Sequence, residues 1–185
     1  MGVRVLRGRY LVGGVVEEFA CGAGPAGWRY TGAREDGYIV DLTLDAFGRP
    51  YRLELIAGGW MLRGGTTGAS LLWVRRAAGG PVEQAAEHSV EAHGFVGDSP
   101  AFWVALARLA APGETSLRVV EVGGGALATR TVDILVRHGE VATAESVPLV
   151  RCEATALDTG QSRGCYLSGD IVVAGDGIEL LDLAE

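Results

Sequence analysis

The sequence predicts a mainly β protein, a curved antiparallel sheet or half-open β-barrel of about ten to eleven strands that encloses one α-helix. Apolar and polar residues alternate along most of the chain, as they do in strands with one buried face. Glycine occurs 29 times in 185 residues, which indicates many tight turns. A single segment has the composition and capping residues of a helix. The length suits one domain that spans residues 1–185.

The N-terminal half is predicted to be a meander of β-hairpins. Residues 38–45 alternate strictly between apolar and polar side chains, and Asp36-Gly37 before them is a hairpin turn signal. Glycine pairs such as Gly13-Gly14 and Gly58-Gly59 separate the other apolar runs. The predicted strands of this half span residues 3–12, 15–21, 38–45, 51–55, 60–63 and 69–76, and residues 28–32 also have the pattern of a strand.

Residues 101–110 are predicted to form the one substantial helix. Asp98 or Ser99 can cap its N-terminus, and Pro100 fits the first helical position. Phe102, Leu106 and Leu109 recur at helical spacing, so they share one face. Since a lone helix must bury its apolar face, we expect a sheet to wrap around it.

Strands resume after this helix. They are predicted at residues 116–122, 127–138, 147–157, 162–168, 171–174 and 178–183. Gly175-Asp176-Gly177 connects the last two as a hairpin, and Asp158-Thr159-Gly160 connects 147–157 to 162–168.

Composition and charge exclude several classes of protein. The net charge is −7 with no lysine, whereas nucleic-acid binding needs a basic face. The chain has no run of 18 apolar residues, so we expect no membrane-spanning helix. The three cysteines and the absence of a secretion signal at the N-terminus predict a cytoplasmic protein with reduced thiols.

Two short segments match the consensus sequence of a catalytic or cofactor-binding motif. Residues 22–27 fit G-x-G-x-x-G, but a strand pattern follows them where a dinucleotide site requires a helix, so we interpret them as a turn. Gly97-Asp98-Ser99 resembles the Gly-Asp-Ser block of an esterase superfamily. That superfamily has a histidine near its C-terminus, and here no histidine follows His138, so we interpret the block as a helix cap.

Metal and thiol chemistry find little support in the sequence. His88 and His93 are five residues apart, which is a poor chelating spacing, and we expect no metal and no cofactor. Cys152 and Cys165 lie on the two strands of one predicted hairpin, where they either share a face or oppose each other. We interpret them as buried thiols.

Aromatic side chains around the helix and at strand ends are the candidate walls of a ligand cavity. A small barrel can keep such a cavity, and aromatic and aliphatic walls suit a flat or polyene molecule. Arg130 shares a face with Val132, Ile134 and Val136. It either meets an anionic group inside the barrel or lies at a strand end outside it. The candidate ligand-binding residues are Tyr38, Tyr51, Trp60, Trp73, Phe95, Trp103 and Arg130, and no catalytic residue is predicted.

From about Phe95 to the end, the chain resembles a bacterial family named for glycolipid binding, whose members have no established function. The resemblance rests on residues 95–102, Pro112-Gly113-Glu114, 153–160 and 170–180. The architecture of this family resembles that of the lipoprotein-localisation factors, in which a helix plugs the mouth of a half-closed barrel. The resemblance implies this fold and a ligand-sized cavity, and it implies no catalytic residue.

These observations lead to three hypotheses about function, of which the third is a structural partner of another protein that uses the exposed edges of its sheet. In the first, a cytoplasmic cavity protein encloses an apolar, polyketide-like or lipid-like small molecule and promotes its cofactor-free cyclisation or isomerisation. Such a reaction needs a cavity that holds a flexible chain in its reactive shape, without a nucleophile or a metal. In the second, the protein is a non-catalytic module that binds or sequesters a glycolipid-like or lipid-like ligand.

Overall fold

The computed structural model describes residues 5–24 and 26–184. These residues form fifteen strands, one α-helix and one short 3-10 helix, η1. The first eight strands are β1 (Val5–Val12), β2 (Val15–Gly24), β3 (Gly27–Arg34), β4 (Ile39–Leu44), β5 (Pro50–Ala57), β6 (Trp60–Thr67), β7 (Ser70–Ala77) and β8 (Ala86–Glu91), with η1 (Val82–Gln84) before β8. The others are β9 (Gly94–Val96), β10 (Gly113–Gly123), β11 (Ala128–Ala144), β12 (Val147–Ala156), β13 (Ser162–Ser168), β14 (Ile171–Gly175) and β15 (Ile178–Ala184), and α1 (Pro100–Leu109) lies between β9 and β10.

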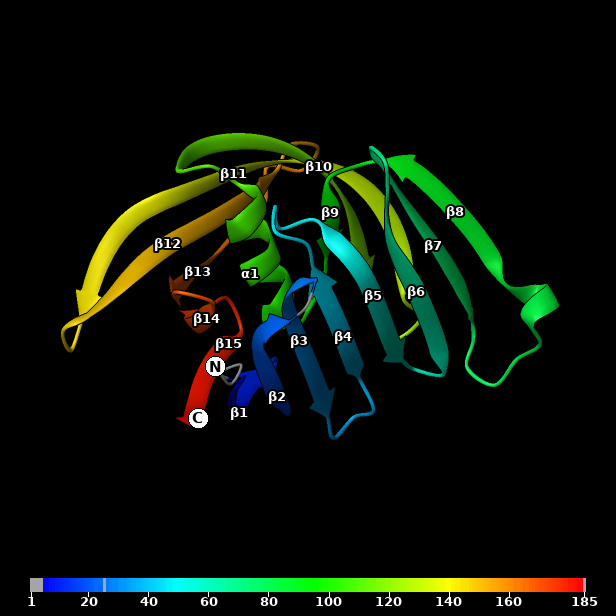
Figure 1. Cartoon of the computed structure of the whole chain (residues 1–185), viewed down its shortest axis with the longest axis horizontal. Coiled ribbons are helices and arrows are strands. Elements are labelled where there is room, and N and C mark those ends of the chain that lie inside the picture. Colours follow the sequence, from blue (N-terminus) through cyan, green and yellow to red (C-terminus); the bar gives the residue numbers. More distant parts are fainter. Residues whose placement is uncertain (1–4, 25, 185) are drawn as a thin grey trace.

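All fifteen strands belong to one sheet. Its order is β8-β7-β6-β5-β4-β3-β2-β1-β15-β14-β13-β12-β11-β10-β9, so nearly every strand pairs with its neighbour in the chain. The first and last strands, β1 and β15, pair with each other and join the two halves. The sheet curves around α1 (Figure 1).

The predicted fold class is confirmed, whereas the predicted number of strands is wrong. Mainly β structure, one helix and an open curved sheet are as expected, but the described residues form fifteen strands instead of ten or eleven. The extra strands include β8, whose side chains are nearly all exposed, and β9, which has three residues. Neither has an alternating pattern long enough to be recognised.

The sheet is not closed into a barrel, because its two edges do not pair. The edges are β8 and β9, which are consecutive in the chain and are separated by Ala92 and His93 only. The chain therefore passes directly from one edge of the sheet to the other. An open sheet with a strongly curved shape leaves hollows at its margins, and these are the places where a ligand can be sought.

The helix begins as predicted. Ser99 is its N-cap, and its hydroxyl oxygen accepts a hydrogen bond from the backbone N–H of Ala101 at 3.4 Å. Pro100 is the first helical residue, and residues 100–106 are all buried. Capping by Ser99 satisfies one of the free N–H groups that every helix leaves at its start.

A buried polar cluster fastens the helix to the N-terminal half of the sheet. One oxygen of the Glu17 carboxylate, on β2, accepts hydrogen bonds from the Ser99 and Tyr30 hydroxyls, each at 2.7 Å. The other oxygen accepts one from Nε of Arg34, also at 2.7 Å. Arg34 in turn donates to the backbone carbonyl of Asp98 at 3.0 Å. Because Glu17 and Ser99 are completely buried, we interpret this cluster as a structural joint.

Candidate ligand-binding site

A largely apolar hollow of the surface is a groove between the tip of the β11–β12 hairpin and the strands β14, β15 and β1. Its volume is about 820 Å³, within the range of small-molecule pockets. We call it the hairpin groove. Apart from Glu145 and Ser168, its lining is aliphatic: Leu6, Ala144, Val147, Leu149, Ile171, Val173, Leu180, Leu183 and Ala184.

One wall of this groove is a hairpin tip that extends beyond the rest of the sheet. Pairing between β10 and β11 stops at Gly113 and His138, and pairing between β12 and β13 stops at Val150 and Leu167. Residues 141–149 pair only across the hairpin itself among the residues that the structure describes. We call them the flap. Figure 1 shows the flap reaching outward from the sheet at the far end of β11 and β12.

The groove was not predicted from the sequence, because none of its residues carries a distinctive chemical signal. Its aliphatic side chains have the appearance of ordinary core residues. A weak signal was nevertheless present: Ile171-Val172-Val173 and Leu180-Leu181 are consecutive apolar residues, so both faces of these strands carry apolar side chains. Leu183 and Val147 remain 45% and 44% exposed, so these strands carry more apolar surface than the core covers.

A second hollow is a narrow slot between α1 and the strands β10 to β12. Phe102, Trp103 and Leu106 of the helix face Ile134, Ala154 and Ala156 across it. Its volume is about 150 Å³, close to the size of an engineered cavity that binds benzene. The slot contains Trp103 and Arg130 of the predicted ligand-binding residues, so the structure brings these two together.

Arg130 lies at the mouth of the slot, at the end of its strand. Val132, Ile134 and Val136 on the same face are buried, whereas the Arg130 side chain is half exposed. Its guanidinium pairs with Glu121 at 2.8 Å and with Asp158 at 2.6 Å. The hydrogen bond that Arg130 donates to the Glu121 carboxylate is the largest of the contacts that raise the pKa of Arg130. Arg130 is therefore a half-exposed residue near the end of β11 whose anionic partners belong to the chain itself, and no closed barrel surrounds it.

Three of the other predicted residues are buried in the core, away from both hollows. The Trp73 ring stacks on His88 at 5.3 Å and meets the edge of Phe95 at 6.0 Å. Tyr38 lies under the guanidinium of Arg34 at 4.2 Å. Burial is the largest cause of a pKa for Tyr38 far above its ordinary value.

Tyr51 and Trp60 complete the predicted set, and neither lines the groove or the slot. Tyr51 is 66% exposed, so it does not form part of an enclosed wall. Trp60 is partly buried under the guanidinium of Arg75, which lies 3.8 Å from its ring centre. The aromatic residues therefore stabilise the sheet, and the larger hollow is aliphatic.

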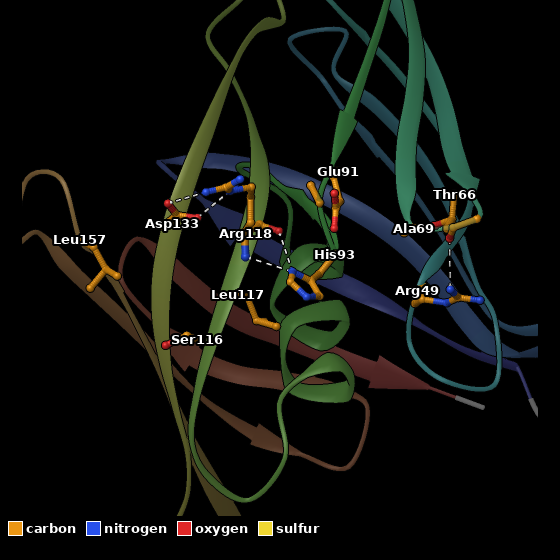
Figure 2. A pocket seen from close by; sticks show the side chains of 12 residues that line it. Arg49, Thr66, Ala69, Glu91, His93, Ser116, Leu117, Arg118, Asp133 and Leu157 are labelled. Atoms are coloured by element: carbon orange, nitrogen blue, oxygen red, sulfur yellow. Dashed lines mark hydrogen bonds and ion pairs between the residues drawn. The ribbon is translucent and has the colours of Figure 1, made fainter.

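A third hollow lies where the two edges of the sheet approach each other. This seam cleft of about 610 Å³ is lined on one side by Arg118 and Asp133, which form an ion pair at 2.8 Å. Arg49 and Thr66 line the facing side (Figure 2). Nδ1 of His93 accepts a hydrogen bond from the backbone N–H of Arg118 at 3.1 Å and also lies 3.2 Å from the carbonyl oxygen of Arg118. Its polar, paired walls give it less apolar contact area than the hairpin groove offers.

The two catalytic-looking motifs have structural roles. Ser99 is enclosed, caps α1 and bonds to Glu17, so it is not presented to a substrate. Most of the motif predicted to be a turn is strand, because residues 22–24 end β2 and Gly27 begins β3. The segment that follows is also a strand, not the helix that a dinucleotide site requires. Pro25 of this motif lies outside the described residues.

The three cysteines are buried and free. Cys152 and Cys165 lie directly opposite each other on β12 and β13, so their side chains share one face of the sheet. Burial raises the pKa of Cys152 to about 12, and burial followed by the charge of Asp170 raises that of Cys21 to about 11. Such thiols are poor nucleophiles near neutral pH. Within residues 5–24 and 26–184, no group of three His, Cys, Asp or Glu side chains is arranged to hold a metal ion.

Comparisons of the chain with known protein families, curated proteins and solved structures find no match. The described residues contain no helix of the length and apolarity needed to cross a membrane. The candidate site therefore rests on the geometry and chemistry of the hollows themselves.

Proposed function

We propose that the protein binds the aliphatic chain of a lipid-like small molecule in the hairpin groove. The observation that carries this proposal is the lining, in which nine of the eleven residues are aliphatic, around a volume of about 820 Å³. Burial of a CH₂ group contributes up to about 0.8 kcal/mol, so a hydrocarbon chain is the ligand that such walls favour. Walls without aromatic rings offer no stacking surface to a flat polyketide-like molecule.

A ladder of saturated fatty acids tests this proposal. Laurate, myristate and palmitate differ only in chain length, and each additional buried CH₂ should strengthen binding by up to about fourfold. The measurement is isothermal titration calorimetry below the critical micelle concentration of each acid. Equal affinities along the ladder, or no binding of palmitate, would contradict the proposal.

Two substitutions locate the binding site. Val147 and Leu183 lie on opposite sides of the groove and are already partly exposed, so Val147→Asp and Leu183→Asp should fold. Each places a charge against the bound chain and should weaken palmitate binding at least about tenfold. The matched controls are Val82→Asp on η1 and Leu157→Asp after β12, which are also exposed but lie outside the groove. Equal losses in variants and controls would place the site elsewhere.

The hypothesis of cofactor-free cyclisation or isomerisation stays a prediction. Aliphatic walls can restrict the shape of a flexible chain, but this alone supports binding and chemistry equally. One incubation distinguishes binding alone from binding followed by reaction. A linear polyene substrate is incubated with the protein, extracted, and examined for an isomer of unchanged mass. Recovery of the substrate unchanged supports the binding module alone.

A further inference from the structure

We infer that the flap, residues 141–149, is a lid that opens to admit the aliphatic ligand and closes over it. This inference rests on the proposed function, because it concerns access to the same groove. It depends on three features of the chain: the isolation of the flap from the sheet, the irregular backbone at its base, and the apolar side chains that it places against the groove.

The first feature is the isolation of the flap. Its strands pair with each other from Val141 and Val150 to Ala144 and Val147. In the described part of the chain, neither β10 nor β13 extends far enough to pair with it. A two-stranded hairpin is only marginally stable in water, so the flap is held more weakly than the rest of β11 and β12.

The second feature is the base of the flap, where a hinge would be required. The register of β11 and β12 shifts between His138 and Glu140, which makes Gly139 the extra residue of a β-bulge. Gly139 has a φ of +123°, a conformation that other residues rarely adopt. Bulges interrupt the ladder and bend the strand, so rotation at this point breaks few hydrogen bonds.

The tip of the flap is also irregular. Glu145 and Ser146 have φ values of +49° and +70°, so both central residues of the turn are left-handed. Such turns favour Asn-Gly, and Glu-Ser in this place stores strain. The sequence therefore does not stabilise the flap by an optimal turn.

The third feature is the side chains on the flap. Ala144, Val147 and Leu149 line the groove, and Val141 is 66% exposed. Leu149 is buried in this position, whereas Val141 and Val147 remain exposed and gain little from it. An aliphatic chain in the groove would provide the contact that they lack, so the ligand itself favours closure.

Hydrogen exchange of the full-length protein with and without palmitate tests this inference. We expect the amides of residues 141–149 to exchange quickly without ligand and to slow markedly with it. At a hundredfold excess over Kd, the slowing can reach about a hundredfold if the open flap does not bind. The β6–β7 turn around Gly68, at the end of another hairpin, is the internal control and should not change. If palmitate binds and the flap amides are unaffected, the flap is not a lid, although the proposed function stands. If palmitate does not bind, the proposed function itself fails.

A shortened variant separates a lid from a fixed wall. Residues 142–149 are replaced by Asn-Gly, which connects the directly paired Val141 and Val150 and closes the hairpin with a favourable turn. Loss of a wall alone would increase the dissociation rate of a fluorescent fatty acid and leave its association rate unchanged. Loss of a lid should increase both rates, because the ligand no longer waits for opening. An unchanged association rate in stopped-flow mixing would overturn the inference.

Discussion

Nε of Arg34 lies 2.7 Å from the carboxylate of Glu17, and the two side chains form a buried ion pair between β3 and β2. Truncation of one partner leaves the other charge buried and unpaired, which usually costs about 3–5 kcal/mol. We therefore predict that Arg34→Met lowers the free energy of unfolding by about this amount in urea titrations.

The control for this variant is Arg29→Met. Arg29 pairs with Asp41 at 2.7 Å, but its side chain is more than half exposed. Exposed pairs contribute about 0–1 kcal/mol, so this substitution should have a small effect. Similar losses in the two variants would contradict the structural role assigned to Glu17 and Arg34.

Ser99 provides a second prediction, which separates a helix cap from a nucleophile. Ser99→Ala removes the cap of α1, which contributes about 0.5–2 kcal/mol, and also the hydrogen bond to the buried Glu17 carboxylate, so the free energy of unfolding should fall by at least about 2 kcal/mol. Binding of palmitate should persist, since Ser99 does not line the hairpin groove. If the wild-type protein hydrolyses a nitrophenyl ester and a folded Ser99→Ala variant does not, the capping interpretation is incomplete and an esterase must be considered.

Local chemistry explains which features the sequence could predict. The helix was recognisable because its start is determined locally, by the N-cap Ser99 and by Pro100 at the first helical position. Strands such as β4 were recognisable because one face is buried and the other is not. By contrast, β9 is defined only by its pairing with β10, a contact between residues about 25 positions apart that no local pattern encodes.

The candidate site was less predictable than the fold. Trp103 and Arg130 both line the slot, but Tyr51 and Trp73, which are also aromatic strand residues, have opposite exposure. Which face of a strand is covered depends on how the whole sheet curves. The groove additionally depends on where β10 and β13 stop pairing, so it is a property of the register and not of any motif.

The buried thiols predict a loss of stability at alkaline pH. Burial raises the pKa of Cys21 and Cys152 from 9.0 to about 11 and about 12. The folded state therefore retains protons that the unfolded state releases above pH 9, so stability is complete below that pH and falls as pH rises towards the folded values. Each thiol contributes a slope of about 1.4 kcal/mol per pH unit in this window.

Urea titrations at intervals from about pH 8 to pH 10 measure this slope. Cys152→Ala removes one thiol and should make the decline shallower, although the cavity that it leaves lowers stability at every pH. A decline of the same steepness in this variant would show that Cys152 does not cause it.

The last prediction concerns the contact between the two halves of the curved sheet. Gly58, in the turn between β5 and β6, has a φ of +53°, and a Cβ atom there would lie 2.1 Å from the carbonyl oxygen of Gly125. Its neighbour Gly59 has a φ of +79°, but a Cβ atom there would meet nothing within 4 Å. The two glycines therefore share the left-handed conformation and differ in the space around them.

Alanine in this conformation costs about 1–2 kcal/mol, so Gly59→Ala should lower the free energy of unfolding by that amount. Gly58→Ala adds a collision with backbone atoms, which cannot move aside as a flexible side chain can. We predict that it is at least about 1 kcal/mol less stable than Gly59→Ala in urea titrations, because the turn must withdraw from Gly125. Equal losses would mean that the β5–β6 turn does not pack against the β10–β11 turn in solution.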